Sequence, residues 1–172
     1  MAIQLNLFVA FLIFFTYYFT QAYSLVEFTN AQCESLDKDF ALFESCFLKS
    51  VNRSYKYLSL KVKLLKLPIT KVKVRIGLYK RVNGYLPFLY NMTVDACRFL
   101  KSSNPNPIAL FYVIFILHSF QHDIVVDKMP YHNINNMVTK ILPFPEGNYM
   151  LELHWIAYDI CRAITKFYWA LT

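Results

Sequence analysis

The sequence predicts an all-β protein, an antiparallel β-sandwich, and three observations support this fold class. Short runs in which apolar and polar residues alternate recur along the chain. Turn residues separate the runs, and no amphipathic helical pattern lies between them. The 172 residues are 56% hydrophobic, which excludes a disordered chain and is more apolar side chain than one small core needs. We therefore expect one domain with apolar surface to spare.

The first 24 residues predict a secretory signal peptide. They contain no charged residue, and an apolar run extends from Leu5 to Phe19. Small residues at Ala22 and Ser24 suit cleavage before Leu25, which would leave a mature domain of residues 25–172. The alternative is a retained membrane anchor. Cleavage predicts an extracellular, secreted protein in an oxidising compartment.

Two strands open the domain, at Leu25 to Cys33 and Phe43 to Val51, and we expect them to form an antiparallel pair. Cys33 and Cys46 flank the turn between them. A disulfide between these two cysteines is predicted, with a structural role, worth about 2–4 kcal/mol in closing its short loop. A redox role is not expected because the chain has no Cys-x-x-Cys motif.

A meander of three strands is expected next, at residues 55–67, 71–80 and 85–99. Pro68 ends the first strand, and Asn83 with Gly84 supplies a hairpin turn before the third. Lysines and one arginine occupy the alternate positions, which predicts a solvated sheet face. The inward positions of these strands are Leu60, Val62, Val74, Ile76, Phe88 and Tyr90.

Two sequences fit the acceptor pattern for N-linked glycan. Asn52 begins Asn-Arg-Ser just past the second strand, and Asn91 begins Asn-Met-Thr on the strand at 85–99. Leu86, Phe88 and Tyr90 share one side of that strand and Asn91 lies on the other, so the glycan is expected to point away from the Phe88 side.

The second half of the chain begins after a break at residues 104–107. The segment 108–117 is apolar on every side, and we expect either a buried strand or a short helix over the open end of a sheet. Strands are expected at 123–127, 137–142, 149–157 and 163–171, the last pairing back across a turn near Asp159. The inward positions of the strand at 149–157 are Leu151, Leu153 and Trp155.

Neither enzymatic chemistry nor a cofactor is expected. The chain has no Gly-x-Ser-x-Gly elbow, no close carboxylate pair and no glycine loop for phosphate. His118, His122 and Asp123 invite a zinc site, but no third histidine or cysteine stands at ligand spacing, so no metal is predicted. The formal net charge of +7 suits an anionic membrane surface, acidic glycans or acidic proteins. Nucleic acid is not an expected partner in this compartment.

Six motifs follow one another along the chain: FTNAQC (28–33), KSVNRSYK (49–56), LPFLYNMTVDACRFL (86–100), HDIVVDKMP (122–130), LPFPEGNYML (142–151) and YDICRA (158–163). In this order they resemble a family of insect secreted proteins. The family is mostly of unknown function, includes the CheB chemosensory proteins, and is similar to the lipid-recognition superfamily of the ganglioside activator and the Niemann-Pick type C sterol carrier.

The resemblance implies an immunoglobulin-like sandwich whose interior is a pocket for a lipid or hydrocarbon tail. This would account for the surplus of apolar side chains. The segment 108–117 is then the candidate lid or rim. The candidate walls, which otherwise read as ordinary core, are the inward positions given above together with Phe111, Phe115, Phe167, Tyr168 and Trp169.

The resemblance leaves two alternatives for the other two cysteines. Relatives carry a cysteine just before the segment that here reads HSFQHD, where this chain has Ser119 and Phe120. The usual partner of Cys97 is therefore missing. Cys161 stands where relatives have a polar residue. Cys97 and Cys161 either bond to each other or stay free.

The first functional hypothesis is a secreted carrier for a lipid, fatty acid, sterol or hydrocarbon, in chemosensory or pheromone signalling. The second is an extracellular interaction module with a filled core that contacts a receptor or ion channel. An immune-type lipid recognition protein and an accessory protein tethered by residues 1–24 are further alternatives. A member that keeps the fold and has lost its ligand is the last.

Overall fold

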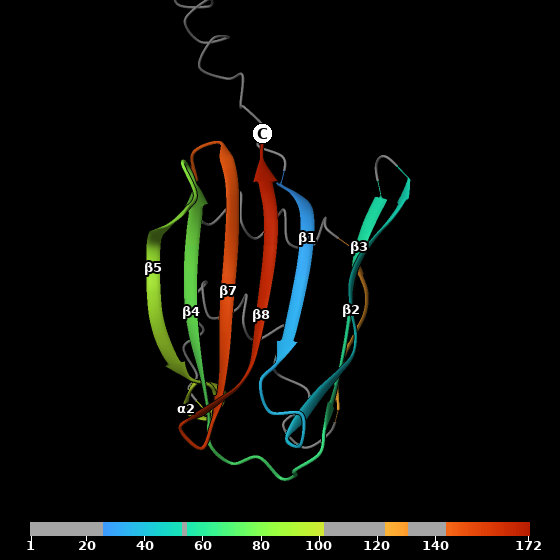
Figure 1. The fold of residues 1–172 in the computed structure, drawn as a ribbon, viewed down its shortest axis with the longest axis vertical. Coiled ribbons are helices and arrows are strands. Elements are labelled where there is room, and N and C mark those ends of the chain that lie inside the picture. Colours follow the sequence, from blue (N-terminus) through green and yellow to red (C-terminus); the bar gives the residue numbers. More distant parts are fainter. Residues whose placement is uncertain (1–25, 53–54, 102–122, 131–143) are drawn as a thin grey trace, which may run out of the picture.

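Two antiparallel sheets face each other in the computed structural model, which describes residues 26–52, 55–101, 123–130 and 144–172. The five-stranded sheet has the order β1-β8-β7-β4-β5, and the three-stranded sheet has the order β2-β3-β6 (Figure 1). The elements are β1 (Val26–Ser35), β2 (Ala41–Asn52), β3 (Tyr55–Leu64), β4 (Val72–Arg81), β5 (Tyr85–Asp95), α2 (Ala96–Lys101), β6 (Ile124–Pro130), β7 (Gly147–Ala157) and β8 (Ile160–Leu171).

The all-β sandwich expected from the sequence is confirmed, and strand alternation explains its core. On β4 the side chains of Val72, Val74, Ile76 and Leu78 are buried, whereas Arg75 is exposed. β7 and β8 follow the same period of two, so the inner faces of the three central strands supply much of the apolar layer between the sheets. Sheets packed this way keep their inner faces about 10 Å apart.

The expected meander of residues 55–67, 71–80 and 85–99 is wrong in its first step. β3 pairs with β2 and β6, whereas β4 pairs with β5 and β7. Residues 65–71 carry the chain from one sheet to the other at the lower end of Figure 1. This connection is longer than a hairpin loop of two to five residues, and its length allows the chain to change layers.

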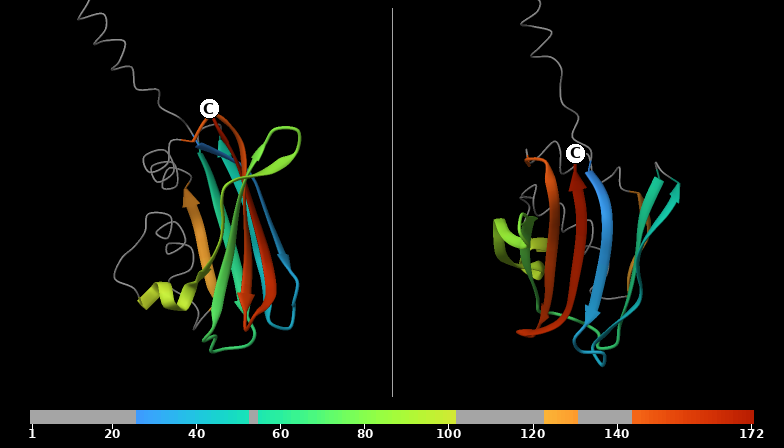
Figure 2. Two further views of the ribbon diagram at one scale, coloured as in Figure 1. Left: turned by 90° about the vertical axis from the view of Figure 1, so that its left-hand side faces the viewer. Right: turned by 45° about the horizontal axis from the view of Figure 1, so that its top comes forward.

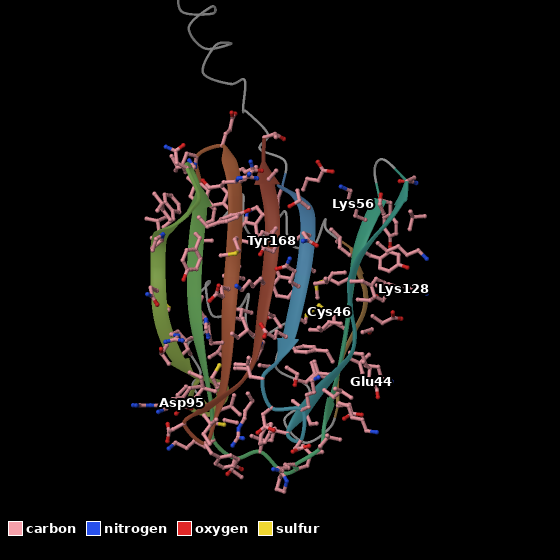
Figure 3. All side chains as sticks on the ribbon, in the orientation of Figure 1. Glu44, Cys46, Lys56, Asp95, Lys128 and Tyr168 are labelled. Carbon is pink, nitrogen blue, oxygen red and sulfur yellow. A yellow bond between two sulfur atoms is a disulfide. The ribbon has the colours of Figure 1, made fainter. Side chains whose placement is uncertain are left out.

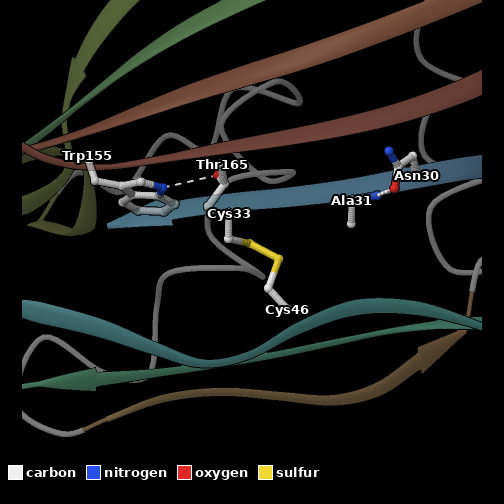
Figure 4. The surroundings of a disulfide bond; sticks show 6 residues. All are labelled: Asn30, Ala31, Cys33, Cys46, Trp155 and Thr165. Atoms are coloured by element: carbon white, nitrogen blue, oxygen red, sulfur yellow. Dashed lines mark hydrogen bonds between the residues drawn. A yellow bond between two sulfur atoms is a disulfide. The ribbon is translucent and has the colours of Figure 1, made fainter. Parts of the chain in front are cut away.

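The expected pairing of the first two strands is also wrong, although the disulfide is confirmed. β1 pairs with β8, and β2 pairs with β3. Cys33 and Cys46 are bonded, with their Cα atoms 6.1 Å apart, and the bond therefore joins the two sheets (Figure 4). Lys56 on β3 forms an ion pair with Glu27 on β1. Both links lie along the edge where β1 approaches the three-stranded sheet (Figure 3).

The strand expected at residues 85–99 ends four residues early. β5 stops at Asp95, and α2 begins at Ala96. The side chain of Asp95 accepts a hydrogen bond from the backbone N–H of Arg98, at 2.9 Å, which is the contact of a helix N-cap. The cap favours a helical turn over a longer strand. The helix considered for 108–117 and the strand expected at 137–142 lie outside the described residues.

A bulge in β5 breaks the alternation that the sequence suggested there. Gly77 pairs with Asn91 and Tyr79 pairs with Pro87, so three residues of β5 oppose one residue of β4. Leu89 in this bulge has a φ of 58° and is exposed. Leu86 is exposed too, in contrast to its expected inward position, because the β4–β5 hairpin tip projects away from the sheet (Figure 2).

Candidate functional site

An apolar cavity lies between the two sheets at the lower end of the sandwich in Figure 1. Its volume is about 60 Å³. Residues from both sheets and from the connections at that end form its wall. The lining consists of Phe40, Ala41, Phe43, Leu60, Val62, Leu64, Ile69, Val72, Ile124, Leu153, Trp155, Ile156, Ala157, Arg162, Ala163, Thr165 and Phe167.

Short side chains explain why the cavity lies at this end. Ala41 begins β2, Ala157 ends β7 and Ala163 lies near the start of β8, and all three are buried. At the inner face of a sandwich each of these positions would otherwise carry a side chain long enough to reach the facing sheet. Phe40 and Ile69 lie in the connections below them and are buried as well. The alanines therefore leave space that the neighbouring rings do not fill.

Two polar side chains interrupt the apolar wall. Thr165 is buried, and its hydroxyl accepts a hydrogen bond from the indole N–H of Trp155, at 3.2 Å (Figure 4). Arg162 donates to the carboxylate of Asp37, and its guanidinium carbon lies 4.6 Å from the ring centroid of Phe40. The Nε atom of Arg162 is buried without a hydrogen-bond partner among the described residues.

A bulge between β7 and β8 turns Arg162 toward the interior. Trp155 pairs with Ala163 and Ile156 pairs with Cys161, so Arg162 is the extra residue on β8. Without the bulge, Cys161 would share the inward side of β8 with Ala163. Because of the bulge, the guanidinium of Arg162 lies at the cavity wall and the thiol of Cys161 does not.

Five of the residues predicted as pocket candidates line the cavity, namely Leu60, Val62, Leu153, Trp155 and Phe167. Val74, Ile76, Leu151 and Trp169 are buried in the core but do not line it. The prediction that Tyr168 lines the pocket is wrong, because this side chain lies on the outer side of β8, where its hydroxyl donates to the side-chain oxygen of Gln32 at 3.0 Å. Phe111 and Phe115 lie outside the residues that the structure describes, and so does the side chain of Tyr90.

Aromatic rings fill the interior at the opposite, upper end. The Tyr149 ring stacks on Trp169 with centroids 5.9 Å apart and lies 5.6 Å from the centroids of both Phe88 and Phe144. Phe28 contacts Trp169 from β1. Burial raises the pKa of the Tyr149 phenol, whose hydroxyl donates to the carbonyl of Pro145. Phe88 and Trp169, predicted as pocket walls, thus belong to this cluster.

Sequence reasoning missed twelve of the lining residues. Some of them, such as Leu64 and Val72, lie on the same inward side of their strands as residues that were predicted to line the pocket, so alternation could have identified them. The alanines gave no signal, because a small residue marks a cavity only when the facing wall is known. The missed residues are Phe40, Ala41, Phe43, Leu64, Ile69, Val72, Ile124, Ile156, Ala157, Arg162, Ala163 and Thr165.

Cys97 and Cys161 are both free thiols, so the alternative in which they bond to each other is not realised. Cys97 packs against the core from α2. Cys161 instead lies on the outer side of β8, with its sulfur 3.7 Å from Nδ1 of His154. Cys161 thus lies on the side of β8 away from the core that Cys97 contacts.

The neighbours of Cys161 form a polar cluster on the outer face of the five-stranded sheet. His154 Nε2 lies 2.5 Å from Glu152 Oε1, and its Nδ1 lies 3.2 Å from the guanidinium of Arg75. Burial alone would raise the pKa of Glu152, but hydrogen bonds from His154 and Lys166 lower it. Burial raises the pKa of the Cys161 thiol, opposed by Arg75. A thiol held neutral in this way is a weak nucleophile.

Among the described residues, no group of three or more histidine, cysteine, aspartate or glutamate side chains is arranged to hold a metal ion. His118 and His122 lie outside those residues. The side chain of Asp123 accepts a hydrogen bond from the backbone N–H of Leu64, at 3.0 Å. Asn52 and Asn91 are both exposed, and their glycosylation stays a prediction.

The model of one protein family matches part of the chain. Residues 74–151 match the model of a family described as a protein of unknown function (DUF1091). The match covers less than half of the chain and runs from β4 to the middle of β7. No curated protein matches the sequence. Within the described part of the chain, no helix has the length and apolar character to cross a membrane.

Proposed function

We propose that this protein is a secreted, non-enzymatic carrier of an apolar ligand whose chain lies between the two sheets. The observation that supports the proposal is the apolar cavity of about 60 Å³ at the lower end of the sandwich. A cavity with such walls stays dry, so an apolar group can enter it without displacing bound water. Burial of that group contributes about 25 cal/mol for each Å² removed from water.

The size of the cavity favours an aliphatic chain over a ring system. An apolar cavity of about 150 Å³ admits a benzene ring, and the volume here is about 60 Å³. A few methylene groups fit that space, whereas a sterol nucleus does not. A longer chain requires the sheets to separate beyond this conformation. The disulfide between Cys33 and Cys46 would keep one edge closed while they do so.

Arg162 favours a ligand with an oxygen acceptor at one end. A guanidinium has five N–H donors, and the contact with Asp37 uses only one side of it. Leaving a buried donor unpaired costs about 1–3 kcal/mol. A carboxylate or carbonyl oxygen at Nε would remove that cost. A fatty acid therefore suits the cavity better than a hydrocarbon does.

The proposed setting is extracellular fluid, with a role in chemosensory or pheromone signalling. The resemblance of the sequence motifs to the insect family of the CheB proteins and to lipid-recognition domains supports this setting. A disulfide that joins the two sheets is compatible with an extracellular protein. The matched family of unknown function adds no activity.

Native mass spectrometry of the protein isolated from culture medium tests the proposal. We expect a mass increment that solvent extraction releases as an aliphatic acid. Ala163→Leu places a larger side chain in the cavity and should abolish the increment. Ala170→Leu makes the same change on the outward side of the same strand and should leave it intact. A protein without ligand after incubation with fatty acids, sterols and long-chain hydrocarbons would refute the proposal.

A protein-interaction module is the second candidate. The specific observation in its favour is the β4–β5 hairpin, where Val82, Leu86 and Leu89 are between 55% and 68% exposed. Contiguous exposed apolar side chains mark contact surfaces. A protein that stays free of ligand in the mass spectrometer would direct attention to this hairpin.

A further inference from the structure

We infer that Asn91 carries an N-linked glycan whose first sugar rests on the ring of Tyr79 and stabilises the edge of the five-stranded sheet. Asn91 begins the acceptor sequence Asn-Met-Thr, and both Asn91 and Thr93 are exposed. The inference goes beyond the proposed function, because it requires the secretory route but no ligand between the sheets.

The acceptor lies on the outer face of an edge strand. β5 is the last strand in the order β1-β8-β7-β4-β5, so within the described part of the chain it pairs with β4 alone (Figure 1). Met92 and Val94 pack against the core, and side chains alternate along a strand, so Asn91 and Thr93 point away from the core. A glycan on Asn91 therefore lies over the outer face of the sheet.

Gly77 lies directly opposite Asn91 on β4, and the ring of Tyr79 takes the place of its missing side chain. Because the two residues pair, a Cβ atom at position 77 would lie on the same outer face, about 4.5–5.5 Å from that of Asn91. Such a Cβ would be 2.8 Å from Cε2 of Tyr79, 3.1 Å from its hydroxyl oxygen and 3.2 Å from Cζ. The outer edge of the Tyr79 ring therefore lies beside the side chain of Asn91.

The backbone gives no other reason for a glycine at position 77. Its φ is not in the left-handed region, in contrast to the φ of 127° at Gly84 and of 144° at Gly147. A glycine inside a strand weakens it and often marks a place where another group approaches the backbone closely. Here the close group is the ring of Tyr79, which is half-buried and keeps apolar area that a further group can cover.

The first sugar of an N-linked glycan suits this ring. It is a pyranose joined to the side-chain amide of Asn91, so it starts within reach of the position opposite. One face of a pyranose exposes mainly C–H groups, which bury apolar area against an aromatic ring. The contact joins β5 to β4 beside the bulge at residues 88–90, where the pairing of the two strands is interrupted. The sugar therefore stabilises the edge of the sheet where its own ladder is broken.

Glycopeptide mass spectrometry of the protein secreted by eukaryotic cells checks the modification itself. The peptide that contains Asn91 should carry a glycan that begins with N-acetylglucosamine. An unmodified Asn91 would overturn the inference at once.

A double-mutant cycle between Asn91 and Tyr79 tests the contact. Asn91→Gln removes the glycan and should lower the thermal unfolding midpoint by about 2–4 °C in the protein that keeps Tyr79. In a Tyr79→Thr background, which keeps strand propensity but lacks the ring, the same change should lower the midpoint by less than about 1 °C. Tyr79→Phe keeps the ring and should show the full loss. Equal losses with and without the ring would overturn the inference.

Tyr85→Thr is the matched control, because it removes another tyrosine ring from the same strand pair. Tyr85 contacts the ring of Tyr168 and pairs with Arg81, which is four residues from Gly77 and thus about 13 Å away along β4. Asn91→Gln should lower the midpoint in this background as much as in wild type. A smaller loss there would show that the effect is not specific to the ring beside the acceptor.

Gly77→Ala tests the same contact without changing the ring. The new Cβ would force the Tyr79 ring away from its place opposite Asn91, so the effect of Asn91→Gln should shrink in this background. An undiminished effect would contradict the assigned position of the ring.

Enzymatic trimming tests whether the first sugar is the one that matters, in an Asn52→Gln background that lacks the other acceptor sequence. An endoglycosidase that leaves one N-acetylglucosamine should keep the midpoint within about 1 °C of the fully glycosylated protein. Complete removal should give the same loss as Asn91→Gln, and it supplies the unglycosylated form if that variant is not secreted. Equal losses after trimming and after complete removal would overturn the role given to the first sugar.

Discussion

The two ends of the sandwich interior are filled in different ways. At the upper end, the rings of Phe28, Phe88, Phe144, Tyr149 and Trp169 contact one another between the sheets. At the lower end, three alanines face larger side chains and a cavity of about 60 Å³ remains. The same strands β4, β7 and β8 run through both ends. The difference comes from the side chains at each end, together with the bulge that turns Arg162 toward the cavity.

Under the proposed function, this contrast assigns stability and ligand binding to different parts of one core. Stacked and tilted aromatic rings contribute about 0.5–1.5 kcal/mol per pair beyond the area they bury. A cavity does the opposite, since the atoms that line it lose contacts and the fold is weakened in proportion to its volume. A protein that keeps a cavity at one end is consistent with a compensating gain when a ligand fills it.

The largest effect is expected at the aromatic end. Trp169→Ala removes a ring that is 5% exposed and that contacts Phe28 and Tyr149, so the free energy of unfolding should fall by about 3–5 kcal/mol. Denaturant unfolding followed by circular dichroism measures the loss. If this variant does not fold, Trp169→Phe keeps a ring beside Tyr149 and should lose less.

Phe47→Ala is the matched control for that prediction, because the Phe47 ring is on a strand but 44% exposed. Its loss should stay near 0.5 kcal/mol. Similar losses for the two variants would contradict the assignment of stability to the aromatic end.

A loss of intermediate size is expected when the bond between Cys33 and Cys46 is removed by changing both residues to Ala. The loop it closes predicts a loss of about 3 kcal/mol in the free energy of unfolding.

The two tryptophans allow the unfolding of each end of the sandwich to be followed separately by fluorescence. In a Trp155→Phe background the remaining Trp169 reports on the aromatic cluster, and in a Trp169→Phe background the remaining Trp155 reports on the cavity end. We expect coincident transitions, since three strands span both ends.

Two separate transitions in that experiment would show that the cavity end unfolds by itself. Cys97→Ala, which removes a free thiol, serves as the control and should change stability far less than loss of the disulfide.

The smallest effect is expected for the stability of the protein at acid pH, through Asp159 at the cavity end. Hydrogen bonds from Lys71 and then from Lys73 lower the pKa of Asp159 from its ordinary value of 3.8 to about 2. Because the pKa is lower in the folded protein, the stabilisation is present above pH 3.8 and is lost as the pH falls toward 2. Thermal unfolding midpoints of wild type and Asp159→Asn should therefore differ most above pH 4 and converge near pH 2. The difference is expected to be small, because the pair is exposed to solvent.

The double change Lys71→Gln and Lys73→Gln removes the same ion pairs from the other side. In a protein that carries both glutamines, adding Asp159→Asn should no longer change how the unfolding midpoint depends on pH. A pH-dependent difference that persists without the two lysines would contradict the assigned cause.

Much of the secondary structure could be predicted because alternation is a local property. The inward residues of β4 and β7 follow from a period of two, and the turn at Asp159 is likewise visible in the sequence. The end of β5 was missed because the N-cap contact between Asp95 and Arg98 competes with the strand there, and the alternating pattern does not report it.

The candidate site was harder to predict than the strands. Leu60 and Leu153 were found because a cavity wall is also an inner strand face. The inward turn of Arg162 depends on a bulge that moves one residue of β8 out of register with β7. No feature of the residues around Arg162 marks that bulge, because it results from the pairing of two strands.

By itself, the sequence determined that this protein is an all-β sandwich, which residues of β4 and β7 face inward, and that Cys33 bonds to Cys46. Only the tertiary structure decided that β3 and β4 belong to different sheets and that the disulfide joins those sheets. It also decided which end of the interior is filled and which is hollow. The reason is that alternation and turns act over a few neighbouring residues, whereas sheet membership and cavities depend on side chains that meet across the fold.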